Sequence, residues 1–213
     1  MDEAMHERRT RKRLQTRQTI SDVATRLFFE RGFDRVTIDE IATAADVGRM
    51  TVFNHFPRKE DMFFDREGEI RDTAFAAIRE RDAGTSPVQA LRILAYRLIE
   101  APDPPFPLFC GTDQFVETAL ASESLKARAR QMRDDFVRAL ATTLADSVGC
   151  AHDDANAHLA AGLIAAAWTV AFLQAHQTVL RTQDAAAANR TFLTLIDRGT
   201  AGVEAALADT AYV

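Results

Sequence analysis

The sequence predicts an all-α protein of about nine helices, in which a small N-terminal three-helix domain precedes a larger helical domain. Apolar residues recur at helical spacing along most of the 213 residues. Capping residues stand before many of these stretches, and no convincing alternation of apolar and polar residues predicts a strand. We expect residues 1–58 to form the first domain and residues 59–213 the second.

The first helix is predicted from an apolar repeat and from the glycine that ends it. One buried helix face is indicated by the spacing of Ile20, Val23, Ala24, Leu27 and Phe28. Gly32 then fits the left-handed position that follows many helices. The segment from residue 1 to 20 carries six basic residues against three acidic ones. It can be a basic arm that reaches phosphates or a minor groove. For residues 1–8, the alternative is a disordered solvated tail.

A short second helix is predicted over residues 38–45. Thr37 is a good N-cap, and Glu40 stands where its carboxylate can reach back to the Thr37 amide, which completes a capping box. Asp46 then fits a sharp turn, because Asp adopts left-handed backbone more readily than most residues. A third helix follows over about residues 48–56, so this stretch reads as a helix-turn-helix.

The outward face of the third helix carries groups that can contact DNA. Arg49 can pair bidentately with guanine and Asn54 with adenine, while Met50 and Phe53 can press on a thymine methyl. Other members of this face can donate to phosphates, and a lysine at the next helix start makes a natural phosphate site. The predicted DNA-binding residues are Thr37, Arg49, Met50, Thr51, Phe53, Asn54, His55 and Lys59. The alternative is a solvated helical hairpin with ordinary surface charges.

Residues from about 14 to 64 resemble the DNA-binding domain of the TetR family of transcriptional regulators. The matching positions are Phe28, Phe29, Gly32, Phe33, Thr37, Ile41, Ala42, Val47, His55, Phe56 and Lys59. The resemblance covers about a quarter of the chain and is specific, because these positions match at fixed spacing across three helices. It implies a homodimer that binds a near-palindromic operator, and a small-molecule inducer site in the second domain.

The chain departs from the family pattern in and beside the third helix. Asp46 stands where the family usually has Gly, Gly48 where it has Ser, Met50 where it prefers Gly, and Phe53 where it prefers Tyr. Phe53 lacks the phenolic hydroxyl that would reach a phosphate, and Met50 adds bulk on the surface that faces DNA. An operator sequence therefore cannot be transferred from relatives.

Charge is unevenly distributed. Residues 1–60 hold twelve Lys and Arg against ten Asp and Glu, whereas the remainder holds fourteen against twenty-one. An acidic protein is not a general nucleic-acid coat, but it can bind one site through a local basic face, and the acidic body would help to orient the basic end toward DNA.

The second domain is predicted to be helical throughout. A first helix spans about residues 59–81, and Ser86, Pro87 and Gln89 mark the start of the next. Residues 102–107 hold four of the six prolines and predict a rigid loop. The remaining helices are expected over about 112–120, 125–144, 155–180 and 184–207.

Residues 155–180 contain no Asp, Glu, Lys or Arg. The apolar run within them is too short and too rich in alanine for a membrane span, which needs about 20 strongly apolar residues, so we expect no membrane partner. A helix buried on nearly all sides fits better, either within one subunit or with the last helix in a four-helix bundle across a two-fold axis. We expect Gly162, Ala166 and Val203 at that dimer interface.

An inducer cavity is inferred from a mixture of aromatic and polar residues, which suits a small-molecule site between helices and equally a core with a few polar groups. The candidate ligand-binding residues are Cys110, Gln114, Phe115, Thr118, Trp168, Phe172 and His176. The chemical class of the inducer cannot be inferred.

Two other functions compete with a regulator. One is a small-molecule-binding helical protein without specific DNA binding, and the other is an enzyme. His152, Asp153, Asp154 and His158 could be imagined as metal ligands, but their spacing matches no strong metal signature, and an Asp at a helix start is explained by capping and the helix dipole. No GxSxG, HExxH or P-loop motif occurs. We therefore expect no catalytic residue, no metal and no cofactor.

The compartment is predicted from the cysteines and the N-terminus. Cys110 and Cys150 are far apart and form no CxxC motif. No apolar stretch follows the charged start, so a signal peptide is not expected. We expect a cytoplasmic protein with reduced thiols. The function expected from the sequence as a whole is a repressor that a small-molecule inducer releases from DNA.

Overall fold

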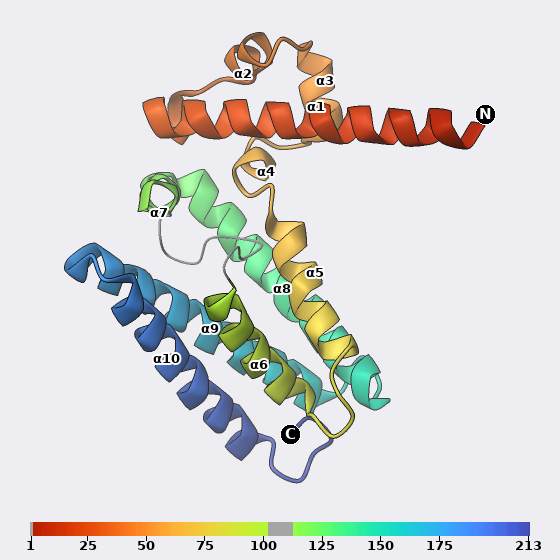
Figure 1. Cartoon of the computed structure of the whole chain (residues 1–213), viewed down its shortest axis with the longest axis vertical. Helices are drawn as coiled ribbons and strands as arrows, with labels where there is room; N and C mark the ends of the chain where they lie inside the picture. Colours follow the sequence, from red (N-terminus) through yellow and green to blue (C-terminus); the bar gives the residue numbers. More distant parts are fainter. Residues whose placement is uncertain (1, 102–112) are drawn as a thin grey trace. The chain divides into compact units, whose positions relative to one another are not determined.

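A computed structural model describes residues 2–101 and 113–213 (Figure 1). These residues form ten α-helices and one short 3₁₀ turn and contain no strand, which confirms the predicted all-α fold. The predicted proline-rich loop and Cys110 lie outside the described residues.

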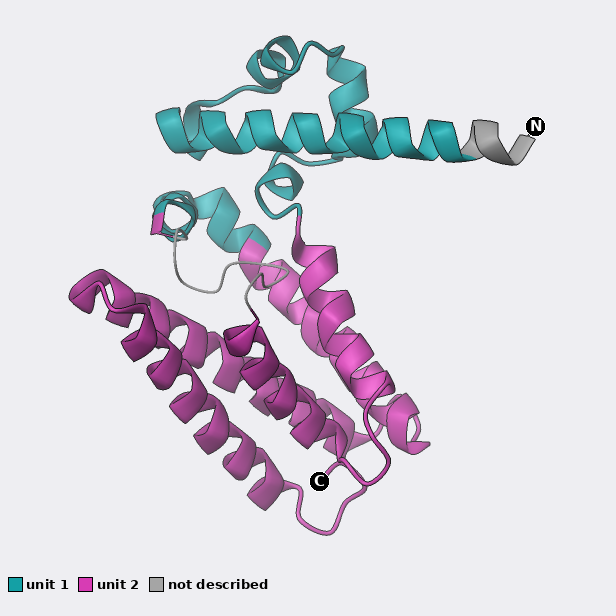
Figure 2. Cartoon of the chain, in the orientation of Figure 1, with its two compact units in different colours: residues 1–65, 114–128 teal, residues 66–113, 129–213 magenta. Residues whose placement is uncertain are grey.

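Two compact units make up the described chain, as Figure 2 shows. The first contains residues 1–65 and 114–128, and the second contains residues 66–113 and 129–213. The first unit therefore holds the predicted N-terminal domain together with a segment from the later part of the chain.

The helices of the first unit pack around a long α1. This helix contacts α2, α4 and the 3₁₀ turn η1, while α2 contacts α3. The element bounds are α1 (Asp2–Arg31), η1 (Phe33–Arg35), α2 (Ile38–Ala44), α3 (Arg49–His55) and α4 (Glu60–Phe63).

The expected basic arm is not an arm in the structure. Its residues belong to α1, which runs without a break from Asp2 to Arg31. No Gly or Pro interrupts that stretch, and Arg, Lys, Gln, Glu and Leu are good helix formers. The basic residues before Ile20 are therefore carried on a helix.

The prediction of a single helix over residues 59–81 is wrong, because two helices occupy that stretch. These are α4 and α5 (Glu67–Arg79). At the break, the ring of Phe64 packs edge-on against Phe63 and Phe115, and Asp65 accepts a hydrogen bond from the Ser21 hydroxyl. These contacts keep residues 64–66 out of a continuous helix, so the described residues contain ten α-helices rather than the expected nine.

In the second unit, α10 lies along α9 and also contacts α6. The added Cβ of an alanine at Gly199 would lie only 2.5 Å from the Cβ of Ala167, so this glycine permits the close approach of α10 to α9. The helices that follow α5 are α6 (Pro87–Glu100), α7 (Asp113–Ala121), α8 (Glu123–Val148), α9 (Ala155–Thr182) and α10 (Ala185–Ala206).

The predicted start signals of these helices are in place. The Ser86 hydroxyl accepts from the Gln89 amide at 3.1 Å, and Asp154 and Asp184 are the N-caps of α9 and α10. By length and composition alone, α9 could cross a membrane. The core helix of a water-soluble protein passes the same test, so this property decides nothing by itself.

Candidate nucleic-acid interface

The helix-turn-helix is held by local capping and by one strained turn residue. The Thr37 hydroxyl accepts from the Glu40 amide at 3.3 Å, and the Glu40 carboxylate accepts from the Thr37 amide at 2.8 Å, which is the predicted capping box. The pKa of Glu40 is lowered chiefly because its carboxylate accepts from the Thr37 amide and also, at 2.8 Å, from the Thr37 hydroxyl. Asp46 has a φ of 53°, as expected for the turn, and the Val47 amide behind it donates to the Ala42 carbonyl at 3.0 Å.

Burial decides which face of α3 remains available. Val52 and the C-capping Phe56 are completely buried against the first unit's core, whereas Met50 is 70% exposed and Phe53 is 36% exposed. Arg49 and Asn54 are also exposed, and Thr51 is half-buried. The structure therefore presents the side chains that sequence reasoning assigned to base contacts on one side of a helix whose other side is anchored.

Arg49 is oriented by two neighbours. Its Nη1 lies 3.2 and 3.0 Å from the two carboxylate oxygens of Asp39 on α2, and its guanidinium carbon lies 5.6 Å from the centroid of the Phe53 ring. Sequence reasoning did not select Asp39, because an acidic residue in the first turn of a helix is already explained by the helix dipole.

His55 lies at the end of α3 beside two arginines of α1. Its carbonyl accepts from Nη1 of Arg17 at 2.6 Å, and the Arg17 guanidinium lies 4.0 Å from the centroid of the Phe56 ring. Burial, followed by the charges of Arg13 and Arg17, lowers the pKa of the His55 imidazole. The basic part of α1 is thereby tied to the C-terminal end of α3.

Lys59 is engaged by the backbone. Its ammonium donates to the carbonyls of Phe33 at 2.9 Å and Val36 at 3.0 Å, and it lies 4.2 Å from the centroid of the Phe33 ring. Burial is the main cause of a lowered Lys59 pKa, which the charges of Asp34 and Glu60 oppose. Lys59 thus ties the chain before α4 to η1. An ammonium carries three donors, so a phosphate contact through the third stays a prediction.

The candidate ligand residues fall into two groups, one in each unit. In the first unit, Phe115 stacks on Phe63 with 4.4 Å between ring centroids, and the Thr118 hydroxyl donates to the Gln114 carbonyl. A single cavity lined by both groups stays a prediction.

The second group lies on α9. Trp168 packs edge-on against Phe192 of α10, with 5.7 Å between ring centroids, and Phe172 stacks with the buried His176, with 6.4 Å between ring centroids. Nδ1 of His176 lies 3.9 Å from Oδ1 of Asp113. Sequence reasoning had not selected Asp113, which no spacing rule connects to a residue on α9.

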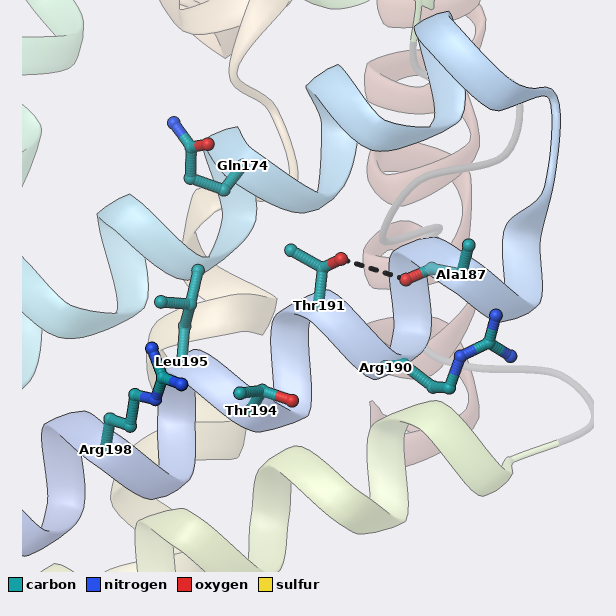
Figure 3. Close-up of a pocket in the computed structure, with 7 residues that line it drawn as sticks. All are labelled: Gln174, Ala187, Arg190, Thr191, Thr194, Leu195 and Arg198. Carbon is teal, nitrogen blue, oxygen red and sulfur yellow. Dashed lines mark hydrogen bonds between the residues drawn. The ribbon is translucent and has the colours of Figure 1, made fainter.

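A groove of about 700 Å³ runs along α9 and α10 (Figure 3). It contains none of the predicted ligand residues. Its lining includes two arginines, two threonines and a glutamine, and Arg190 lies 3.7 Å from Asp184. The residues that line it are Gln174, Ala187, Arg190, Thr191, Thr194, Leu195 and Arg198. Among the described residues, no group of three or more His, Cys, Asp or Glu side chains could hold a metal ion.

Comparison with known proteins shows that the helix-turn-helix region is similar to bacterial regulators. Residues 20–65 match the family described as bacterial regulatory proteins, tetR family. Over 83 residues the chain is 35% identical to the HTH-type transcriptional regulator TcmR of Streptomyces glaucescens. That match spans 39% of this chain and only 37% of the length of TcmR.

Two solved structures extend the similarity over most of the chain. A putative TetR-family regulator from Mesorhizobium loti is 18% identical, with a TM-score of 0.55 over 89% of this chain and 97% of its own. FadR of Thermus thermophilus, a TetR-family repressor solved with lauroyl-CoA, is 26% identical, with a TM-score of 0.50 over 86% and 94%. The first similarity, at such low identity, concerns the fold alone.

The His55 environment predicts a pH dependence of stability. Since the pKa of His55 is lowered from 6.5 in the folded protein, the unfolded chain takes up a proton first as the pH falls. His55 therefore has no effect well above 6.5 and destabilises the protein progressively below it. We expect the melting temperature of wild type to fall more than that of His55→Gln between about pH 8 and about pH 5.5. Parallel decreases in the two proteins would contradict this assignment.

Proposed function

The chain belongs to the TetR family of bacterial regulatory proteins, and from that premise we propose that it is a ligand-responsive transcriptional repressor. As a homodimer it binds a near-palindromic operator, and a small-molecule inducer releases it. The single observation that carries the DNA-binding part is the exposed face of α3, with Arg49, Met50, Phe53 and Asn54 above the buried Val52.

The chemistry of this face suits the major groove. Arg49 and Asn54 are the side-chain types that pair bidentately with guanine and adenine, and Met50 and Phe53 supply apolar surface. The α1 arginines beside the end of α3 add positive charge next to the base-reading side chains. Phosphate contacts by such residues would position the helix without reading sequence.

Substitutions on α3 and at Lys59 should separate base reading from phosphate binding. Arg49→Ala and Asn54→Ala should each weaken operator binding by about 1–3 kcal/mol and relax base preference nearby. Lys59→Ala should weaken binding to all duplexes equally and lower the salt slope by about one, if its ammonium also reaches a phosphate. Gel shifts at several salt concentrations, with an operator selected from random duplexes by the full-length protein, measure both effects.

The possible outcomes also distinguish the competing functions. If Arg49→Ala binds the operator as tightly as wild type does, the assignment of α3 to the major groove is wrong. A wild-type protein that selects no duplex but binds small molecules would support a ligand-binding protein without DNA binding. Because Lys59 also holds two carbonyls of the 3₁₀ turn, its variant needs a thermal unfolding control to show that a loss of binding is not a loss of folding.

The dimer part of the proposal is supported by an unpartnered apolar stripe on α9. Its members are spaced alternately by four and three residues, the 3.5-residue repeat of helices that pack on one another. All are exposed, and all but one are apolar: Leu159, Leu163, Ala166, Val170, Leu173, Gln177 and Leu180. So long an exposed apolar row on a monomer is a sign of an interaction surface.

The neighbouring glycines leave room for a partner. A Cβ added at Gly162 of α9 or at Gly202 of α10 would meet no atom within 4 Å, so a second backbone could approach at both places. Val203, in contrast, is 2% exposed and packs in the core of its own unit. The expectation that Val203 lies at the dimer interface is wrong, because its side chain points toward the core rather than outward with the α9 stripe.

Charge placed on the stripe should therefore dissociate the protein without unfolding it. Val170→Glu should give the mass of one chain by light scattering at micromolar concentration, where wild type gives the mass of two. The matched control is Ile70→Glu on α5, which makes the same kind of change at a residue 43% exposed, against 50% for Val170. A wild-type mass of one chain would exclude this assembly, and dissociation by both variants would show that the effect is not specific to α9.

The inducer part of the proposal centres on Trp168. A cavity of only about 10 Å³ lies beside its indole, with Gly199 and Val203 among the other lining residues. That volume is far below the hundreds of Å³ of a ligand site, so a bound inducer would have to displace neighbouring side chains. The FadR structure contains lauroyl-CoA, and an apolar or amphipathic ligand would suit the aromatic surroundings of Trp168.

Trp168 should consequently report the ligand. We expect its fluorescence to change on binding of an inducer and, more weakly, on binding of operator DNA, because coupling between two sites is reciprocal. A panel of apolar and amphipathic compounds is screened by fluorescence, and each binder is then tested by gel shift. A compound that changes the Trp168 signal at saturation but leaves operator affinity unchanged would show that this cavity is not the regulatory site.

A further inference from the structure

We propose that Asp39 is a specificity-determining residue that acts through Arg49. From α2 it holds the guanidinium of Arg49 on α3 with one edge free for a guanine. This inference rests on the proposed DNA-binding function and assigns a role to a side chain outside that helix.

The geometry leaves one edge of Arg49 open. Only Nη1 is used by Asp39, at 3.2 and 3.0 Å from its two oxygens. The Phe53 ring lies beside the guanidinium. Nε and Nη2 donate no hydrogen bond to any described residue. These two groups lie on the same edge of the planar guanidinium and point their hydrogens in parallel, as a bidentate contact requires.

That open edge matches guanine. The major-groove side of guanine presents two acceptors, N7 and O6, side by side. A free arginine side chain has considerable rotamer freedom to lose when it forms such a contact. Asp39 and Phe53 restrict this freedom before DNA arrives, so less of it remains to be lost on binding.

The carboxylate also discourages the competing contact. An arginine on a DNA-facing surface can bind a phosphate of any sequence instead of a base. The negative charge of Asp39 beside Nη1 repels a phosphate from that end of the guanidinium, while it leaves the Nε and Nη2 edge unopposed. Asp39 therefore favours base reading by Arg49 over nonspecific binding.

The pair is exposed, with 59% of the Arg49 side chain and 66% of the Asp39 side chain accessible to solvent. An exposed ion pair contributes little to stability. Loss of Asp39 should consequently leave folding nearly unchanged and appear instead in the ratio of affinities for two related duplexes.

A double-mutant cycle tests the inference. The probes are the duplex that the full-length wild-type protein selects from a random pool and single-base variants of it. Arg49→Ala should abolish the preference at one guanine in each half-site. Asp39→Ala should reduce the preference at that same guanine about two- to fivefold, the range expected for an exposed pair, and should have no further effect on preference in the Arg49→Ala background.

Two further variants separate this role from general charge and from folding. Glu30→Gln removes one negative charge from the same unit, where the carboxylate pairs with Arg26 of α1, and should strengthen binding to all duplexes equally. Asp39→Asn keeps an acceptor for Arg49 and should retain part of the preference. Thermal unfolding of each variant should match wild type.

The outcomes distinguish this inference from the function on which it rests. If the wild-type protein selects no duplex, the proposed function fails and the role of Asp39 fails with it. If Arg49→Ala loses base preference but Asp39→Ala behaves like Glu30→Gln, only the role of Asp39 is wrong. An effect of Asp39→Ala on base preference that persists in the Arg49→Ala background would also overturn it.

Discussion

The ring of Phe63 contacts three separate parts of the first unit. It packs against Phe28 and Phe33 at 6.3 and 6.2 Å between centroids, and it stacks on Phe115 of α7 at 4.4 Å. One aromatic side chain on a four-residue helix thus connects α1, the 3₁₀ turn and a segment some fifty residues further along the chain. The order of the first unit depends on this junction, because α4 is too short to be stable without tertiary packing.

Beside that junction, α3 has one buried side and one exposed side. The apolar side of α3 is anchored by Val52 and Phe56, so its remaining side chains can be polar or bulky without disturbing the core. This explains how Met50 and Phe53, which depart from the family pattern, are compatible with the fold. Under the proposed function, their effect would fall on which operator is recognised, since both lie on the solvent side of an anchored helix.

Much of this structure could be predicted from sequence where the signal is local. The Thr37 capping box, the left-handed Asp46 and the end of α1 at Gly32 each depend on residues within a few positions of one another. The break between α4 and α5 could not, because it depends on Phe115, far along the chain. The same limit applies to α9 and α10: lack of charge indicated an interface, but only packing distinguishes the outward α9 stripe from the inward Val203. The Asp39–Arg49 pair likewise joins residues whose proximity comes from the turn between two helices.

The uncharged α9 stripe has a consequence for ionic strength. Contacts between lysines or arginines and phosphates release counterions, so binding of this protein to DNA weakens steeply as salt is added. An association through Leu163, Val170 and their neighbours involves no ion pair on α9, and apolar contacts are insensitive to screening or are strengthened by strongly hydrated salts. If the protein dimerises through this stripe as proposed, high salt would strip it from DNA while leaving its two chains together. The free dimer, rather than the monomer, would then be the species that returns to the operator.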